Sequence, residues 1–212
     1  MRGGRVNRKR VRRLYRLQGL QVRMRRRKHM CLHRGPVPLA TPAHERWSMD
    51  FVHDALFDGR VFQMLTVMDQ VSRQSPLIEP ALAHSAKSGS DALEWVMDAL
   101  GVPTSITVDH GAEFMSKALE DWAWRRGIKL DFIRPGKPNE NARIESFNGR
   151  LRDECLHVNQ FTSVEDAQRK IEAWRQNYNH TRPHNSLRNL TPHEFAQQGQ
   201  QKRNDEGRKF LL

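Results

Sequence analysis

Apolar and polar positions follow a strand-like pattern in five segments of the chain after residue 44. Short apolar runs bounded by turn residues predict β-strands, which are typically about four to eight residues long. These runs are residues 47–52, 61–68, 76–82, 105–108 and 128–133. Asp58-Gly59, between the first two runs, favours a hairpin turn.

Apolar residues at helical spacing predict helices between and after these strands. The helices are expected at residues 90–100, 117–126, 140–155 and, after a cap at Thr162 or Ser163, about 164–178. Gly101 and Gly127 stand where the first two would stop. Trp95 and Trp174 fall on the apolar sides of their helices, so we expect both in the core rather than stacked on bases.

Three consecutive strands followed by alternating helices and strands predict an α/β fold with a mixed five-stranded sheet flanked by helices. A short basic helix is expected over residues 6–19, before Gly19. The prolines in residues 34–42 suit an extended linker. We therefore expect three parts, which are an arm (1–44), an α/β core (45–197) and a tail (198–212).

The positive charge is concentrated in the arm. The whole chain has a net charge of +12; residues 1–44 contain 14 Lys and Arg and no Asp or Glu, and the remainder has a net charge of −2. Such a block would neutralise phosphates and release counterions, which favours nucleic-acid binding over a solvated basic tail. The expected DNA-binding residues of the arm are Arg8, Lys9, Arg10, Arg12 and Arg13.

Composition also argues against several classes of protein. No apolar run reaches the roughly 18 residues of a membrane-spanning helix, and no apolar signal region is present. Cys31 and Cys155 give no disulfide framework and fit a reducing compartment. The alternating spacing of His29, Cys31 and His33 does not match a structural zinc site. These features favour a cytoplasmic protein without membrane contact.

Three carboxylates lie where they could form a site. Asp50 is inside the first strand, where an ionised carboxylate is costly unless it is paired or metal-bound. Asp109 ends the fourth strand, and Glu145 lies on the helix expected over 140–155. Taken singly, each acid also fits a cap, a turn or a solvated charge. If the first and fourth strands are neighbours and the helix packs beside them, the three acids converge.

Converging carboxylates repel one another unless a cation neutralises them. Their hard oxygen ligands suit Mg²⁺ or Mn²⁺. Two such ions can activate an attacking oxygen and stabilise the leaving 3′-oxygen of a phosphodiester. The acids therefore indicate metal-dependent phosphoryl-transfer chemistry.

The acids and their surroundings resemble the D,D(35)E signature of retroviral-integrase-like bacterial insertion-sequence transposases. Between Asp109 and Glu145 lie 35 residues. The resemblance covers about residues 4–197, and its blocks are specific in combination. The blocks are residues 5–16, 46–52, 109–114, 134–138 with Asn141, 145–149, 178–179, 182–184 and 190–192.

The resemblance implies a ribonuclease-H-like fold and a DNA transposase catalytic core. Asp50, Asp109 and Glu145 would be its catalytic metal ligands for Mg²⁺ or Mn²⁺. The implied reaction is DNA cleavage at an element end, which frees a 3′-OH, followed by attack of this hydroxyl on a second phosphodiester. Further residues would position DNA, with a solvated helix face as the alternative: Lys137, Asn141, Asn148 and Arg152. Residues 182–184 (Arg-Pro-His) would contact DNA or hold the last helix down.

The resemblance also implies a nucleoid-associated bacterial protein with several partners. The implied partners are the ends of the element, target DNA, further copies of the chain in a multimer and an upstream-frame helix-turn-helix protein.

The chain departs from the family pattern at a few positions. His110 replaces the usual Asn and Ala112 the usual Pro, and neither change removes a ligand. These transposases carry a longer upstream segment, so we expect a catalytic core without full end recognition.

Two other functions stay in view. One is a truncated, catalytically silent DNA-binding remnant of a transposase, which the short upstream segment would favour and the intact set of acids disfavours. The other is a ribonuclease-H-type nuclease acting on hybrids. The 35-residue interval and the Arg-Pro-His block favour a transposase over this nuclease.

Overall fold

The structure, a computed structural model of the 212-residue chain, describes residues 7–20, 43–84, 86–111, 113–134 and 141–209. The chain divides into two units, Met1–Val37 and Pro38–Leu212. This division precedes the boundary near residue 44 that composition favours. The linker expected over residues 34–42 lies outside the described residues, which resume at residue 43.

The first unit contains the expected basic helix, α1 (Arg8–Leu17). Asn7 caps its start, because its side-chain oxygen accepts a hydrogen bond from the backbone N–H of Lys9 at 2.9 Å. At the other end Gly19 has a φ of +65°, and the N–H of Leu20 bonds to the carbonyl of Tyr15 at 3.1 Å. A left-handed residue at this place ends the helix, as the glycine predicts.

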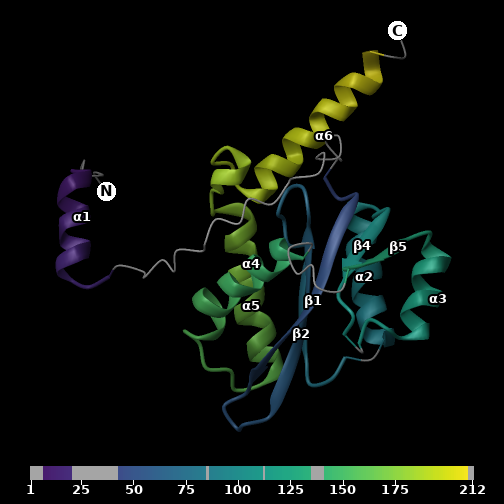
Figure 1. Cartoon of the computed structure of the whole chain (residues 1–212), viewed down its shortest axis with the longest axis horizontal. Coiled ribbons are helices and arrows are strands. Elements are labelled where there is room, and N and C mark those ends of the chain that lie inside the picture. Colours follow the sequence, from purple (N-terminus) through teal and green to yellow (C-terminus); the bar gives the residue numbers. More distant parts are fainter. Residues whose placement is uncertain (1–6, 21–42, 85, 112, 135–140, 210–212) are drawn as a thin grey trace. The chain divides into compact units, whose positions relative to one another are not determined.

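The second unit is built on a mixed five-stranded sheet, which confirms the expected fold class (Figure 1). Its strands are β1 (Arg46–Ala55), β2 (Val61–Asp69), β3 (Leu77–Ala81), β4 (Ser105–Val108) and β5 (Lys129–Phe132). They lie in the order β3-β2-β1-β4-β5. The pairs β1–β2 and β2–β3 are antiparallel, whereas the pairs β1–β4 and β4–β5 are parallel.

Helices alternate with the later strands and follow them. They are α2 (Ala86–Leu100), α3 (Lys117–Arg126), α4 (Ala142–Leu151), the π-helical turn η2 (Arg152–Leu156), α5 (Val164–His180), the short η3 (Asn185–Leu187) and α6 (Pro192–Lys209). Ser163, not Thr162, caps α5, and Gly127 with a φ of +67° ends α3. Within the described ranges no helix has the length and apolar character needed to cross a membrane.

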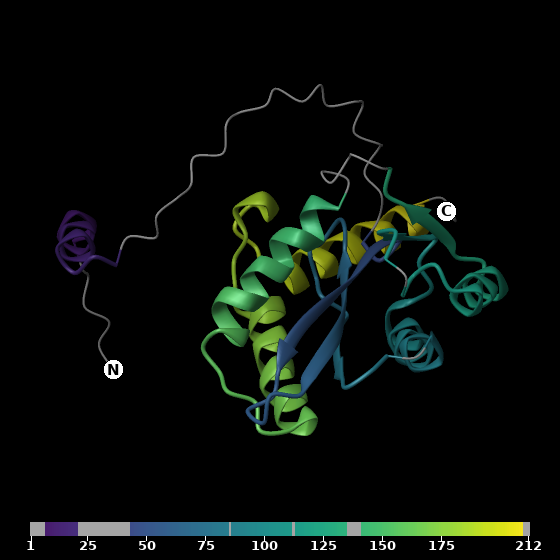
Figure 2. The same ribbon diagram turned by 60° about the horizontal axis from the view of Figure 1, so that its bottom comes forward.

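Two apolar cores lie on the two faces of the sheet. Figures 1 and 2 show α2 and α3 on one face and α4 and α5 on the other. Met49 and Ile106 belong to the core beneath α2 and α3, whereas Val52 and Phe147 belong to the core beneath α4 and α5. Because alternate residues of a strand point to opposite faces, Asp50 shares the α4–α5 face with Val52.

The prediction that Trp95 lies in the core is wrong. Its side chain is 71% exposed, and the buried face of α2 consists of Leu93, Val96 and Met97. Gly89, one turn before Leu93, faces β2, because a Cβ atom there would lie 3.7 Å from the Leu65 side chain. The apolar face is therefore rotated by about one residue from the expected one. Trp174 does pack against a core, as expected.

Two helices extend differently from the expected ranges. The helix expected over 140–155 is α-helical only to Leu151, and the wider turn η2 continues it while keeping Cys155 buried. Helix α6 continues through residues 198–209, which were expected as a tail. It begins with a reciprocal cap, in which the Thr191 N–H donates to Glu194 Oε2 at 2.8 Å and the Glu194 N–H donates to Thr191 Oγ1 at 3.2 Å.

Candidate active site

Strands β1 and β4 bring two of the predicted acids to neighbouring positions. The parallel register pairs Ser48 with Thr107, and continuing it by two residues puts Asp50 opposite Asp109. The Gln70 amide joins the two strands, because its Nε2 donates to Ser48 Oγ at 2.9 Å and to Thr107 Oγ1 at 2.8 Å. The adjacency of the first and fourth strands, on which the convergence of the acids depends, is therefore present.

The Asp50 carboxylate is held from two sides. Its Oδ1 accepts the Phe51 N–H and its Oδ2 accepts the Asn148 amide, each at 2.8 Å. Burial raises the pKa of Asp50, and the charge of Asp109 raises it further, whereas these two hydrogen bonds act in the opposite direction. Thr66, opposite on β2, donates to the Asp50 carbonyl at 3.0 Å. The result is an oriented carboxylate beside a second one.

The segment after β4 is shaped around Asp109. Its Oδ1 accepts the Gly111 N–H at 2.8 Å. A Cβ atom on Gly111 would lie 2.9 Å from this oxygen and 3.0 Å from Glu113 Oε2, so only glycine fits without displacing a carboxylate. Three residues later the Phe114 ring stacks on Phe51 of β1, with centroids 5.0 Å apart. This stacking fastens the Asp109 segment to the strand that carries Asp50.

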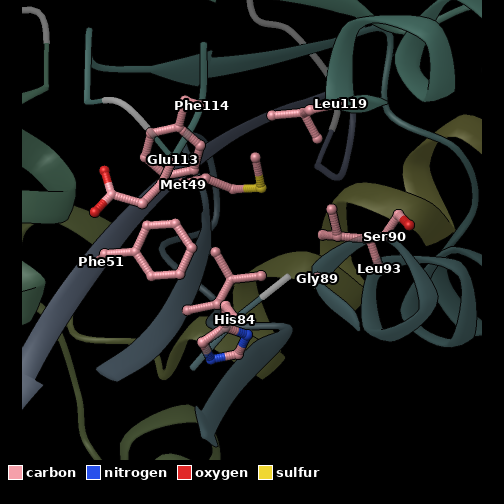
Figure 3. A pocket seen from close by; sticks show the side chains of 10 residues that line it. Met49, Phe51, His84, Gly89, Ser90, Leu93, Glu113, Phe114 and Leu119 are labelled. Atoms are coloured by element: carbon pink, nitrogen blue, oxygen red, sulfur yellow. The ribbon is translucent and has the colours of Figure 1, made fainter. Parts of the chain in front are cut away.

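An apolar cavity of about 50 Å³ lies behind this stacked pair (Figure 3). Met49, Phe51, Phe114 and His84 are among its lining residues. It has room for a few water molecules at most. Because Met49 and Phe51 point to the opposite face of β1 from Asp50, the cavity lies on the other side of the sheet from this carboxylate.

Glu145, the third predicted acid, is exposed in the first turn of α4. Asn148 is one turn further along this helix and bonds to Asp50, so Glu145 lies on the face of α4 that is turned toward the aspartates. In the part of the chain that the structure describes, no three His, Cys, Asp or Glu side chains form a group that could hold a metal ion. The structure thus brings Asp50 and Asp109 together and does not gather Glu145 with them.

The residue types around the two aspartates nevertheless fit a hard divalent cation. Asp50 and Asp109 supply carboxylate oxygens, the ligands that Mg²⁺ prefers. Burial raises the pKa of Asp50 and the charge of Asp109 adds to this, and a bound cation would offset both effects. Each carboxylate also has a hydrogen-bond donor that fixes its orientation, as expected for metal ligands.

The predicted DNA contacts differ in exposure. Lys137 lies outside the described residues, and Arg152 is exposed at the start of η2. Asn141 and Asn148 are only 4% and 1% exposed, because this side of α4 packs toward the sheet. Neither amide is therefore presented to DNA. The basic residues of α1 lie in the first unit, and those whose side chains are described are exposed: Lys9, Arg10, Arg12 and Arg13.

Sequence reasoning missed the role of Asn148 as a partner of Asp50. The available signal was its position three residues after Glu145, on a helix expected to pack beside the first strand. The contribution of Gln70 to the pairing of β1 with β4 had no sequence signal. Tertiary contacts over such separations require the strand order to be known.

Comparisons with known proteins agree with this arrangement. Residues 40–138 and residues 126–192 match two family models, both described as integrase core domain. The chain is similar to the insertion element IS407 uncharacterized 31.7 kDa protein of Burkholderia multivorans, with 43% identity over 195 residues, covering 92% of this chain and 70% of the relative. It is also 40% identical over 195 residues to the IS476 uncharacterized 39.2 kDa protein of Xanthomonas euvesicatoria, covering 90% and 56%.

Among solved structures, the chain is similar to the HTLV-2 integrase catalytic core domain in complex with magnesium (trimeric form). The TM-score is 0.59 at 16% identity, and the match covers 73% of this chain and 97% of that one. At this identity the likeness concerns the fold. It confirms the ribonuclease-H-like fold that the sequence resemblance implies.

Proposed function

This chain belongs to the bacterial insertion-sequence transposases with an integrase core domain, and we propose that it catalyses metal-dependent cleavage and strand transfer of DNA with Asp50, Asp109 and Glu145. The observation that carries the proposal is the oriented pair of Asp50 and Asp109 on adjacent strands. The Asn148–Asp50 hydrogen bond adds to it, because it ties the helix of Glu145 to this pair.

The proposed cofactor is Mg²⁺ or Mn²⁺, held by the two aspartates and, after its side chain turns toward them, by Glu145. When bound, such an ion supplies charge stabilisation for the attacking and leaving oxygens of a phosphodiester. The integrase core that shares this fold is described as a complex with magnesium, which supports the choice of metal.

The protein's own groups have a positioning role in this proposal. The Gly111 N–H orients the Asp109 carboxylate and the Asn148 amide orients that of Asp50. Neither donor carries a charge, so the carboxylates keep their negative charge for a cation. Held in advance, they need little rearrangement when substrate binds.

The proposed DNA contacts are Arg152 beside the acids and the basic residues of α1, with Lys137 as a further candidate. Arg152 acts electrostatically on Asp50, so it lies near the pair. We also propose that the chain works as a multimer on paired DNA ends, with an upstream-frame helix-turn-helix protein as a candidate partner. The trimeric form described for the related integrase core supports a multimer.

A strand-joining assay tests the function. A short duplex with a recessed 3′-OH end is incubated with the wild type, Glu145→Gln and Glu120→Gln in the presence of Mg²⁺ or Mn²⁺. Glu120 is a matched control, because it is an exposed acid in the first turn of another helix, α3. We expect metal-dependent joining by the wild type and by Glu120→Gln, and its loss in Glu145→Gln.

Three results would overturn the proposal. Joining that persists in Glu145→Gln would remove this residue from the site. Wild-type protein that binds DNA with steep salt dependence and joins none would favour the silent DNA-binding remnant instead. Cleavage of an RNA–DNA hybrid without joining would favour the nuclease.

A further inference from the structure

A second polar site lies on the other side of helix α4 from Glu145. A pocket of about 230 Å³ is lined there by side chains from four segments of the chain. Its charged and aromatic lining residues are Arg73, Arg143, Arg150, Tyr178 and His184. We propose that this pocket binds a phosphate group.

The pocket is distinct from the proposed active site. On α4, Arg143 and Arg150 are seven residues apart and share one face, whereas Glu145 and Asn148 lie on nearly the opposite one. The remaining lining groups come from the β2–β3 turn, from α5 and from the segment before η3, none of which carries a predicted metal ligand.

Positive charge predominates among the described residues that line this pocket. Among the described residues, no carboxylate forms an ion pair with Arg73, Arg143 or Arg150. The nearby Asp69 is fully buried and already accepts hydrogen bonds, including two from Ser72 at 2.7 and 2.5 Å. A phosphate would supply the missing negative charge and several acceptor oxygens.

The pKa values of two lining groups are lowered, mainly by burial and in addition by neighbouring arginines. Burial, together with the neighbouring Arg143, lowers the pKa of Arg73 to about 10. Burial, with Arg150, Arg182 and Arg73 adding to it, lowers the pKa of His184 to about 4. Both shifts mean that further positive charge is disfavoured in this place, which is the condition that a bound anion relieves.

The donors of the pocket are held in position before any ligand arrives. Arg143 Nη1 donates to the Gln70 carbonyl at 2.8 Å, and Arg150 lies near Tyr178. His184 is 7% exposed and packs edge-on against the Tyr178 ring, with centroids 5.0 Å apart. Its Nε2 has no hydrogen-bond partner within the described part of the chain, although a buried polar group rarely lacks one. A phosphate oxygen is a suitable partner for this nitrogen.

The pocket also bears on the Arg-Pro-His block (residues 182–184), for which the sequence allowed two roles, DNA contact or holding the last helix down. Arg182 pairs with Glu154 of η2, and the backbone N–H of His184 donates to the Leu190 carbonyl at 2.9 Å, so the block does fasten the chain after α5. The same fastening brings the His184 ring into the pocket. The volume is several times that of one water molecule, about 30 Å³, which leaves room for a phosphate and its hydration.

The test is the binding of inorganic phosphate to the full chain. Binding is measured from the NMR signal of the His184 ring and by calorimetry. We expect a saturable shift of the His184 signal in the wild type. Arg73→Gln should weaken phosphate binding by roughly tenfold or more, since it removes a charge-assisted hydrogen bond. Arg60→Gln, an exposed arginine on the β1–β2 hairpin, is the matched control and should bind as the wild type does.

Arg143→Gln is a second variant for the case that Arg73→Gln does not fold, and we expect it to weaken binding as well. The proposal is overturned if phosphate gives no saturable shift at His184. Equal weakening by Arg60→Gln and the pocket variants would also overturn it, because it would indicate general screening of charge.

A competing short DNA duplex distinguishes two sources of the phosphate. Displacement of inorganic phosphate by the duplex would assign the pocket to the DNA backbone, an assignment that rests on the proposed function. Phosphate binding without displacement would assign it to a free phosphate-bearing molecule. Neither result depends on strand joining, so failure of the joining assay and failure of phosphate binding are separate outcomes.

Discussion

The side-chain amide of Asn148 donates to Oδ2 of Asp50 at 2.8 Å, which joins helix α4 to strand β1 across 98 residues of sequence. The helix that carries Glu145 is therefore bonded directly to Asp50, the carboxylate with which Glu145 is proposed to act. We expect Asn148→Ala to lower the rate of strand joining by about ten- to a hundredfold, as is typical for partners of metal ligands. DNA binding should be nearly unchanged.

The matched control is Asn159→Ala, whose amide also donates at 2.8 Å, to the Cys155 carbonyl outside the site. Joining rates and DNA affinity are measured over a range of Mg²⁺ concentrations. A positioning role predicts that only Asn148→Ala requires more metal. Equal effects of the two variants would reduce the role of Asn148 to general stability.

Asp50 should destabilise the metal-free protein at neutral pH. Its pKa is raised in the fold, mainly by burial, so the folded state favours the protonated form. This contribution to stability is complete below the ordinary carboxyl pKa and is lost as the pH rises through the raised value. Asp50→Asn should therefore increase the thermal midpoint at pH 7 without divalent cations, and by less at pH 3.

Asp58→Asn provides the opposite sign in the same measurement. Hydrogen bonds from Arg60 lower the pKa of this exposed carboxyl, so its charge favours the folded state above the ordinary pKa.

Added Mg²⁺ should stabilise the wild type and not Asp50→Asn, since a ligand of the folded state raises the thermal midpoint. A lower midpoint for Asp50→Asn at pH 7 without metal would contradict the prediction.

Gly111→Ala should impair activity without unfolding the protein. The new Cβ would lie 2.9 Å from Asp109 Oδ1, so the carboxylate must move. Displacement of a reacting group by a fraction of an ångström to one ångström lowers rates by up to about a hundredfold. Gly149→Ala is the control, because its Cβ meets no atom within 4 Å and a helical alanine should stabilise by about 1 kcal/mol. Joining rates and urea unfolding check both.

Phe147 and Trp95 should differ greatly in their contributions to stability. Phe147 is 1% exposed and lies against Trp174 and Tyr178, with ring centroids 5.6 and 5.0 Å away. Phe147→Ala should cost about 3–5 kcal/mol of unfolding free energy. Trp95→Ala should change it by about 0.5 kcal/mol or less, because this ring is mostly in solvent. Similar losses in urea titrations would show that the Trp95 face of α2 is covered in solution.

The contrast between these two residues shows which parts of the fold could be predicted from the sequence. The five strands and the principal helices were predictable, because their apolar runs are short and bounded by clear turn and cap residues such as Gly127. The buried side of α2 was not predictable. Apolar residues occur on two adjacent sides of this helix, so the sequence pattern fits either side against the sheet.

The candidate site was predictable to a similar degree. Asp50 and Asp109 were identifiable from their places in strands, and the parallel pairing of β1 with β4 brings them together. The burial of Asn148 and the separate position of Glu145 depend on how closely α4 approaches the sheet. That approach is fixed by side-chain packing and by the turn η2, neither of which has a periodic signal in the sequence.

The central place of β1 in the sheet has a consequence for the lifetimes of backbone amides. This strand is paired with β2 along its length and with β4 near its start, so its amide hydrogens should exchange with solvent only on global unfolding. Glu145, in the first turn of α4, belongs to a helix end, where exchange proceeds by local opening. Deuterium should therefore replace the amide hydrogen of Glu145 long before that of Asp50. The strand that carries Asp50 would then stay in place while the start of the helix that carries Glu145 moves.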